Sequence, residues 1–248
     1  MILTLRLIEF TTLSTLKMDT PGYFEDQKLQ GTPGFFSELW TAKNGLFSGA
    51  LTAMGVAFTA IFLGTVLGVF IGITLAYGKQ PGRFIARVYT DVIRGIPLLA
   101  LILANFYLLS VVGVNLNALQ AGVLSLGIFC SSHVGEMVRG GLQNLPVGQT
   151  EAAQSIGLNF TQTFRYVLLP QALRQILPTW TNTAVEIVKG TTLISVIGLS
   201  EIILATQQVI ARNFQTLNFY AFAGLIYFII CFSIERLGKH VEKKIAIK

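Results

Sequence analysis

Long apolar stretches alternate with short polar segments along the chain, and this pattern predicts a helical protein that crosses a membrane several times. A helix needs about 20 consecutive apolar residues to cross the hydrocarbon core of a bilayer. Apolar stretches long enough for this occur repeatedly, so we predict an all-α membrane protein, a bundle of five spans. The predicted spans are residues 49–77, 91–112, 119–138, 178–206 and 213–234.

Glycine recurs at every fourth position in the first predicted span. Gly64, Gly68 and Gly72 therefore lie on one face of the helix. A face of small residues lets a second helix approach closely. We predict that this face is a helix packing surface rather than a ligand site.

The two ends of the chain differ from the spans. Residues 1–48 mix charges of both signs with Thr-Pro-Gly turns, and Arg6 and Glu9 interrupt the first apolar run, so no cleaved signal peptide is predicted. We predict an N-terminal extension there, with a candidate helix on the membrane surface. The transmembrane domain is predicted at residues 49–238, followed by a basic cytoplasmic tail at residues 239–248.

One polar segment, at residues 139–178, is too long for an ordinary connection between helices. It is punctuated by glycine and proline, and it lies between the third and fourth predicted spans. We therefore predict that it projects from the membrane.

Two short helices are predicted within this segment. Residues 151–156 are mostly good helix formers, and Gly157 can end that helix in the left-handed conformation. Asn159 or Thr161 can cap a second helix, whose apolar residues fall at helical spacing. Pro170 is predicted to stop the second helix, and it can open the next one. Two short helices at an angle would form a compact knob.

The composition agrees with a membrane protein. Hydrophobic residues make up 52% of the chain and charged residues only 12%, which is too apolar for a soluble domain of 248 residues. The net charge of +6 would suggest a nucleic-acid partner in a soluble protein, but here the basic residues flank apolar spans. We therefore predict contact with membrane lipid and no nucleic-acid partner.

Basic residues are concentrated on one side of the predicted topology. Lys79, Arg83 and Arg87 follow the first span and further basic residues follow the last one, whereas the opposite side carries only Arg212. The positive-inside rule places the basic side in the cytoplasm. The N-terminus is therefore predicted outside, and the segment 139–178 and the C-terminus are predicted inside.

The two cysteines, Cys130 and Cys231, both lie in apolar stretches. A cysteine in such a stretch usually behaves as a small hydrophobic residue. Their spacing fits no zinc or redox motif, so we predict neither a disulfide nor a metal site.

Charged residues inside a span are costly, and each is therefore a candidate for function. Glu186 and Lys189 are three residues apart and share a helix face. They can form a packed ion pair. Alternatively, they can line the path of a zwitterionic solute together with Asn182, Thr191 and Thr192. The sequence alone supports both interpretations.

A second group of candidates lies in the second and third spans. Glu136 and Arg139 can form a salt bridge that anchors the third span, or they can contact the solute. His133 can bind substrate or sense protonation, but a packing role is the favoured interpretation. Arg94 can extend to the lipid headgroups at the membrane edge, or it can contribute to the solute path.

Four motifs, in order, resemble the permease subunits of ABC importers. They are Arg94-Gly-Ile-Pro97, Glu136-Met-Val-Arg139-Gly-Gly, Glu151-Ala-Ala with Gly157 and Leu169-Pro170, and Lys189-Gly-Thr-Thr-Leu193. Together they resemble the polar amino acid uptake class, of the histidine/glutamine permease type, from about residue 49 to residue 235. The fourth motif departs from the usual Lys-Asp-Thr-Ser-Leu, because Gly190 and Thr192 replace the acid and the serine. His133 stands where that family more often has an aromatic residue.

The resemblance implies a five-span bundle of the type I ABC importer kind with a cytoplasmic coupling helix. The residues that it assigns to docking in a groove of a separate ATPase are Glu151, Ala152, Ala153, Gly157 and Pro170. It further implies two copies of that ATPase, which bind ATP and Mg, a second permease that is identical or similar, and an extracytoplasmic solute-binding protein. The chain itself is then no enzyme and binds no cofactor, and its sequence has no Gly-x-x-x-x-Gly-Lys-Ser/Thr loop for phosphates.

The expected function is import of polar amino acids across a bacterial inner (plasma) membrane by alternating access, driven by the partner ATPase. Lys189 and Arg94 favour an acidic amino acid, whereas Glu186 could equally serve a cationic one. The alternative is an ion-coupled amino acid carrier in which Glu186, Lys189 and His133 relay protons. A scaffold or an intramembrane enzyme is a third hypothesis, but no Ser/His or paired-Asp arrangement supports an enzyme.

Overall fold

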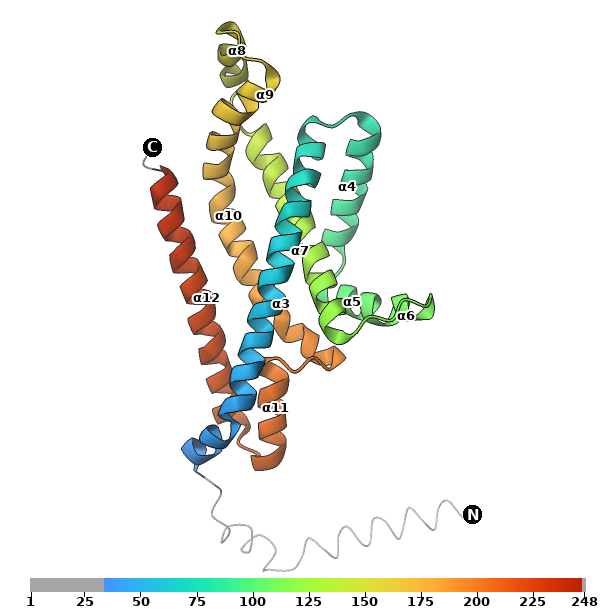
Figure 1. Cartoon of the computed structure of the whole chain (residues 1–248), viewed down its shortest axis with the longest axis vertical. Helices are drawn as coiled ribbons and strands as arrows, with labels where there is room; N and C mark the ends of the chain where they lie inside the picture. The colour runs from blue at the N-terminus through green and yellow to red at the C-terminus, as the bar shows by residue number, and fades with distance from the viewer. Residues whose placement is uncertain (1–33, 247–248) are drawn as a thin grey trace, which may run out of the picture.

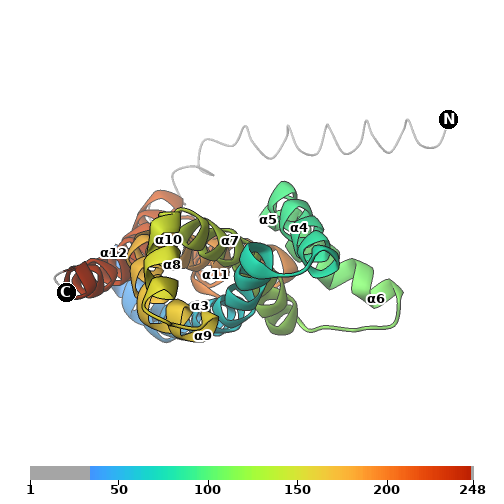
Figure 2. The same ribbon diagram turned by 90° about the horizontal axis from the view of Figure 1, so that it is seen from above.

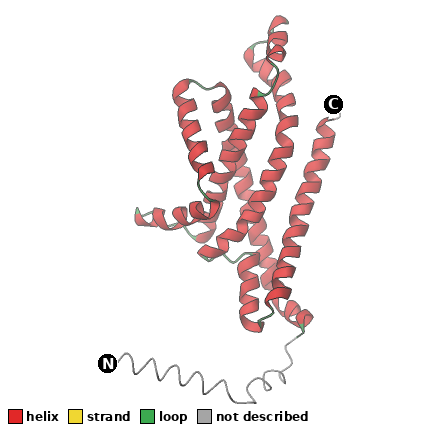
Figure 3. Ribbon diagram, turned by 180° about the vertical axis from the view of Figure 1, so that it is seen from behind, coloured by secondary structure: helices red, strands yellow, loops and turns green. Residues whose placement is uncertain are grey.

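The computed structural model describes residues 34–246, and every regular element in this range is a helix (Figure 3). The elements are α3 (Phe35–Tyr77), α4 (Gln80–Gly95), α5 (Leu98–Leu103), η1 (Ala104–Leu108), α6 (Leu109–Val111), α7 (Ala118–Gln143), α8 (Val147–Ser155), α9 (Phe160–Thr163), η2 (Phe164–Leu168), α10 (Leu169–Gly190), η3 (Thr191–Ile197), α11 (Ile202–Asn213) and α12 (Thr216–Ala246). The predicted all-α class is confirmed for this range. The candidate surface helix, to the extent that it involves residues 1–33, lies outside the described residues.

Three described helices, α3, α7 and α12, are long and apolar enough to cross a membrane by themselves. Two bent pairs also qualify if each is counted as one span. α4 is bent by 107° against the segment Leu98–Val111. The continuous helix Phe160–Ile197, which comprises α9, η2, α10 and η3, is bent by 51° against α11. The described residues thus hold three to five candidate spans, and two of the five predicted spans are not single helices.

The second predicted span, residues 91–112, is wrong as a single helix. After Ile96 and Pro97 the chain turns by 107° into α5. Proline lacks an N–H and disfavours helical torsion angles in the residue before it, and Ile96 is accordingly extended, with φ −94° and ψ 130°. Arg83 and Arg87, which follow the first span, lie inside α4 and not in a short turn.

The fourth predicted span, residues 178–206, is also wrong as a single helix. Pro178 lies inside α10 rather than at its start. Pro170 does not stop the preceding helix, because the π-turn η2 runs directly into α10 and Pro170 lies in the first turn after it. The break comes at Gly198, which has a left-handed φ of 86°, and α11 follows.

The first and last helices are longer than predicted. α3 begins at Phe35, so the boundary predicted at residue 48 falls inside a continuous helix. α12 continues to Ala246, so the predicted basic tail from residue 239 is helical over most of its length.

α3 and α7 pack closely through the predicted glycine face. A Cβ atom placed on Gly64, Gly68 or Gly72 would lie only 2.5 to 2.6 Å from a Cβ atom of α7. The α7 residues that carry those atoms are Cys130, Val134 and Val138. Because no side chain fits at these three positions, the prediction of a helix packing surface is confirmed.

The long helices run along one axis of the molecule (Figure 1). α8 and α9 project beyond them, at the end that also holds the α3–α4 connection and the end of α12. Seen from above, α10 and α4 lie on either side of α7, and both pack against it (Figure 2). The molecule therefore offers two candidate regions, the projecting α8–α9 unit and the surface around α4, α7 and α10.

Candidate functional site

The projecting unit, here called the knob, consists of α8, α9 and residues 156–159 between them. α8 ends at the predicted place, because Gly157 has a φ of 84°. Its N–H donates to the carbonyl of Gln154 at 2.9 Å, and the N–H of Leu158 donates to the carbonyl of Ala153 at 3.1 Å. These bonds are typical of a helix that ends in a left-handed residue, so the predicted conformation of Gly157 is confirmed.

α9 begins with a reciprocal cap. The Asn159 side chain accepts from the N–H of Gln162, and the Gln162 side chain accepts from the N–H of Asn159, each at 2.9 Å. Of the two capping residues that the sequence allows, Asn159 is therefore the one that acts, and Thr161 lies inside the helix.

The residues that the resemblance assigns to docking are only partly exposed on the knob. Glu151 and Ala152 are exposed, whereas Ala153 is buried. Gly157 is exposed as well, and Pro170 is exposed at the base of the knob in the first turn of α10. Ala153 is thus placed for packing within the chain.

The knob is tied to α10 by a side-chain hydrogen bond and carries two exposed apolar side chains. The Gln171 side chain of α10 donates to the Gln149 side chain of α8 at 3.1 Å and ties the two helices together. Val147 and Ile156, at the two ends of α8, are highly exposed.

One side of α10 is polar and exposed over its length. Its residues recur every three or four positions, and they are Gln175, Thr179, Asn182, Glu186 and Lys189. Such spacing places them on one side of the helix, here called the polar face of α10. Gln175 and Thr179 were missed from the sequence, although continuing the same spacing backwards from Asn182 would have found them.

Glu186 and Lys189 do not form the ion pair that their spacing allows. Two ion pairs occur among residues 34–246, and neither includes these side chains. The packed ion pair is therefore wrong. Lys189 lies instead within electrostatic range of Glu235 on α12. The side chains of Glu186 and Lys189 are both exposed, so both can reach a solute.

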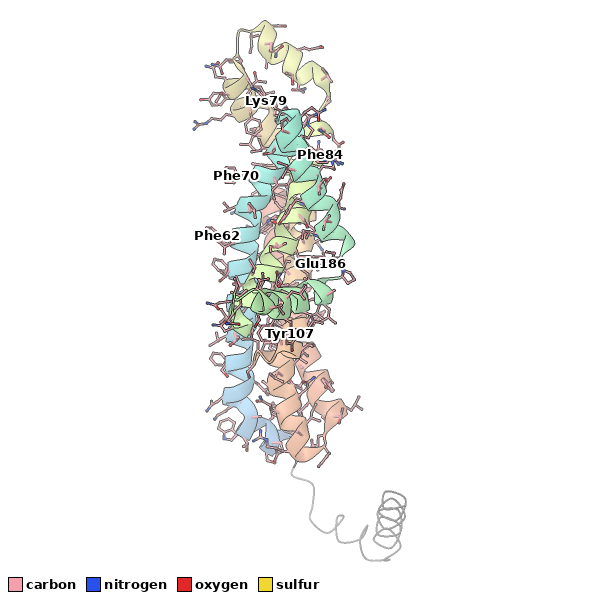
Figure 4. The ribbon with its side chains drawn as sticks, turned by 90° about the vertical axis from the view of Figure 1, so that its right-hand side faces the viewer. Phe62, Phe70, Lys79, Phe84, Tyr107 and Glu186 are labelled. Carbon is pink, nitrogen blue, oxygen red and sulfur yellow. The ribbon has the colours of Figure 1, made fainter. Side chains whose placement is uncertain are left out.

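The bend between α4 and α5 lies against the end of α10. A Cβ atom placed on Gly190 would lie 3.0 Å from the Cδ2 atom of Leu98, the first residue of α5. Arg94 is exposed in the last turn of α4, just before this bend. Glu186 lies near the middle of the long axis, at the depth where α4 gives way to α5 (Figure 4). The fold thus brings Arg94, Glu186 and Lys189 to a similar depth.

The two threonines after this face differ in their environment. Thr192 is half-buried and donates to the carbonyl of Lys189 at 2.8 Å. Thr191 is fully buried and donates to the carbonyl of Val188 at 2.7 Å, so it does not belong to the polar face. Its hydroxyl lies 3.3 Å from that of Tyr227, which donates to Glu201. Apart from its charge, nothing in the sequence pattern marked Glu201 as a functional candidate.

The candidates on α7 are held by local contacts. Arg139 donates to the same Glu136 oxygen from Nε at 2.9 Å and from Nη2 at 2.7 Å, so the predicted salt bridge is present. The other oxygen of Glu136 is buried without a hydrogen-bond partner among the described residues. His133 Nδ1 lies 2.9 Å from the carbonyl of Phe129, and the two rings are 4.2 Å apart. These contacts favour a packing role for His133.

Cys130 and Cys231 are both free and buried. Cys130 lies against Gly64 of α3 and contributes to the close packing described above. No group of three or more potential metal ligands occurs in the part of the chain that the structure describes.

Comparisons with known proteins agree on one family. The family described as "Binding-protein-dependent transport system inner membrane component" matches residues 64–247. The probable glutamine ABC transporter permease protein GlnP of Bacillus subtilis is 35% identical over 202 residues, covering 79% of this chain and 92% of that protein. The arginine transport system permease protein ArtQ of the same organism is 30% identical over 200 residues, covering 79% and 91%.

Solved structures show the same fold. A crystal structure of an amino acid ABC transporter with histidines matches with a TM-score of 0.79 and 30% identity, covering 86% of this chain and 99% of that one. The MetNI methionine ABC transporter in an inward-facing conformation matches with a TM-score of 0.70, covering 81% and 96%, and at 20% identity it supports the fold alone. The predicted type I importer architecture is thereby confirmed.

Proposed function

The chain belongs to the family of binding-protein-dependent transport system inner membrane components, and from this membership we propose that it is the membrane-spanning permease of an ATP-driven importer of polar amino acids. Two relatives named as permeases for glutamine and arginine support an amino acid as the solute. The chain provides the path, and a separate ATPase provides the energy.

The observation that carries this proposal is the knob. α8 projects beyond the long helices, and it presents Glu151 and Ala152 next to a sharp left-handed turn at Gly157. Small residues permit close approach, so a groove of an ATPase can seat this helix. Movement of the ATPase then moves α10, because the side chains of Gln149 and Gln171 join the two helices. ATP and Mg are bound by the ATPase, of which two copies are expected.

The polar face of α10 supports a second permease copy, identical or similar, as a partner. Glu186 and Lys189 are exposed in α10, which together with α11 forms a candidate bent span. A charge that faces lipid near the bilayer centre costs about 3 kcal/mol or more. Two permeases related by a two-fold axis would bring two such faces together around a water-filled path, which avoids this cost.

The charges around this face suit a zwitterionic solute. Lys189 can pair with a carboxylate and Glu186 with an ammonium group, while Asn182 and Thr192 provide neutral hydrogen bonds. Arg94 lies at a similar depth and adds a second cation to Lys189, which favours an acidic amino acid. Alternating access would expose this site first to one side and then to the other.

The distribution of basic residues supports the orientation. The knob, the α3–α4 connection and the end of α12 lie at one end of the molecule, and that end carries Lys79, Arg83, Lys243 and Lys244. By the positive-inside rule this end is cytoplasmic. An extracytoplasmic solute-binding protein would then meet the end that holds α11.

An ion-coupled carrier is the less favoured alternative. It would require Glu186, Lys189 and His133 to exchange protons. His133 is held by Phe129 within α7, and the ion pairs among residues 34–246 do not link Glu186 to Lys189. An ion-coupled carrier also needs no projecting knob, because it has no ATPase partner to bind.

Substitutions in the knob test the proposal. We expect Glu151→Lys and Gly157→Leu to insert normally but to lose ATP-dependent amino acid uptake in reconstituted vesicles. Gly55→Leu on α3 is the matched control for the fold, because Gly55 lies outside the knob, with a negative φ and with nothing within 4 Å of an added Cβ. Unchanged, ATP-independent uptake in the Glu151 and Gly157 variants would exclude the importer function.

A further inference from the structure

Glu201 is a fully buried carboxylate that none of the roles above uses. It lies in the break between η3 and α11, and its exposed fraction is 0%. The ion pairs found among residues 34–246 do not include it. A carboxylate without water or a cation is costly unless hydrogen bonds replace its hydration.

Both carboxylate oxygens of Glu201 accept hydrogen bonds. Oε2 accepts from the Tyr227 hydroxyl of α12 at 2.7 Å. Oε1 accepts from the backbone N–H of Leu204 at 3.0 Å, so the side chain caps the start of α11. One carboxylate thus joins two helices that meet only at this end of the bundle.

The network continues toward the candidate solute path. The Tyr227 hydroxyl also lies 3.3 Å from the Thr191 hydroxyl, and Thr191 donates to the carbonyl of Val188 at 2.7 Å. Thr191 stands between Lys189 and Thr192 at the end of α10. The hydrogen bonds of Glu201 therefore reach the backbone that carries Lys189.

α3 closes the break from another side. A Cβ atom placed on Gly49 would lie 2.9 Å from the carbonyl carbon of Glu201 and 3.0 Å from its oxygen. Irregular backbone at membrane depth is tolerated only where the protein itself satisfies its polar groups. Glu201 does so where η3, α11, α12 and α3 meet.

We propose that Glu201 is a positioning residue for transport. It fixes the break after η3 through Tyr227 and the cap of α11, and in this way it sets where Lys189 and Thr192 stand relative to α12. The inference rests on the proposed transport function. When the contact is lost, the knob still engages the ATPase, but each ATP hydrolysed moves less solute.

The first test is Tyr227→Phe, which removes one hydroxyl and keeps the ring. Tyr220→Phe is the matched control, because Tyr220 lies on the same helix with an exposed side chain. In reconstituted complexes we expect the ratio of amino acid uptake to ATP hydrolysis to fall about fivefold or more in Tyr227→Phe and to stay unchanged in Tyr220→Phe. If uptake and hydrolysis instead fall together, in proportion to the amount of assembled complex, Glu201 is only structural and the proposal is overturned.

A double substitution tests whether the two residues act as one unit. We expect Glu201→Gln to lower the same ratio, and the double variant with Tyr227→Phe to lower it no further than the more severe single variant. Independent, multiplicative losses would contradict a shared role.

A second measurement does not depend on transport. Cys231 lies one turn after Tyr227 on α12 and is 9% exposed, whereas Cys130 on α7 is 1% exposed. We expect Tyr227→Phe to speed thiol labelling of Cys231 in membranes by about tenfold, which corresponds to the loss of one hydrogen bond to a charged group, and to leave Cys130 unchanged.

The two measurements separate the two claims. If Cys231 is labelled faster in Tyr227→Phe but the complex imports no amino acid, the proposed function is contradicted and the hydrogen-bonded contact is supported. Active uptake with unchanged labelling and an unchanged uptake-to-ATP ratio in Tyr227→Phe and Glu201→Gln would sink the role of Glu201 and keep the proposed function.

Discussion

Gly68→Ala should weaken the contact between α3 and α7. The added Cβ would lie 2.6 Å from the Cβ of Val134 and 2.8 Å from the carbonyl oxygen of Ser131. Carbon atoms in contact normally stand about 3.5 to 4.0 Å apart, so the two helices must separate by roughly 1 Å. The added methyl group meets helix backbone at Ser131 and the β-branched side chain of Val134, and neither can rotate away.

The expected cost follows from these distances. Forcing an extra methyl group into a packed contact costs about 1 to 3 kcal/mol. Replacing glycine by alanine inside a helix stabilises the helix by up to about 1 kcal/mol through helix propensity. The separation also loosens the neighbouring contacts of Gly64 and Gly72, so we expect a net loss of about 1 to 2 kcal/mol.

A matched control lies on the same helix. Gly55 is exposed, and a Cβ placed there has nothing within 4 Å. Gly55→Ala should therefore gain up to about 1 kcal/mol through helix propensity. Both full-length variants can be unfolded with denaturant in mixed micelles and compared with the wild-type chain. The reasoning is refuted if Gly68→Ala proves as stable as Gly55→Ala.

Three further predictions concern the solute path, the Glu136–Arg139 salt bridge and the knob. Lys189→Ala should lower amino acid uptake about tenfold or more without changing the amount of assembled complex, and wild-type uptake kinetics would remove Lys189 from the path. Arg139→Gln leaves the half-buried Glu136 carboxylate unpaired and should cost about 1 to 3 kcal/mol in an unfolding assay, with most of the loss recovered when Glu136→Gln is added. Asn159→Ala removes the reciprocal cap of α9 and should cost about 1 kcal/mol locally, seen as faster proteolysis of the knob, and an unchanged cleavage rate would show that the cap is dispensable.

Much of the bundle could be predicted because long apolar runs and glycine spacing depend on local sequence. The helices α3, α7 and α12 follow from hydropathy, and the packing of Gly68 follows from its spacing to other glycines. Gly157 was predictable for the same reason, and the cap of α9 was narrowed to Asn159 or Thr161, since helix ends depend on a few neighbouring residues.

The errors came where one residue overrides the hydropathy pattern. Pro97 separates α4 from α5 inside the predicted second span, a break that hydropathy alone does not mark. Pro178, which looked like a helix start, is accommodated inside α10. Glu201 is a further charge inside the predicted fourth span, but a partner distant in sequence, Tyr227, donates a hydrogen bond to it. Such contacts depend on the tertiary fold.

The docking of α8 against a separate ATPase is tested most directly by cross-linking in native membranes. A single cysteine introduced as Glu151→Cys would be exposed on the knob, whereas Cys130 and Cys231 are buried. We predict that this cysteine cross-links to a nucleotide-hydrolysing subunit and reacts with a membrane-impermeant thiol reagent only from the cytoplasmic side. Reaction from the outside, or the absence of any ATPase in the cross-linked product, would contradict the proposed function.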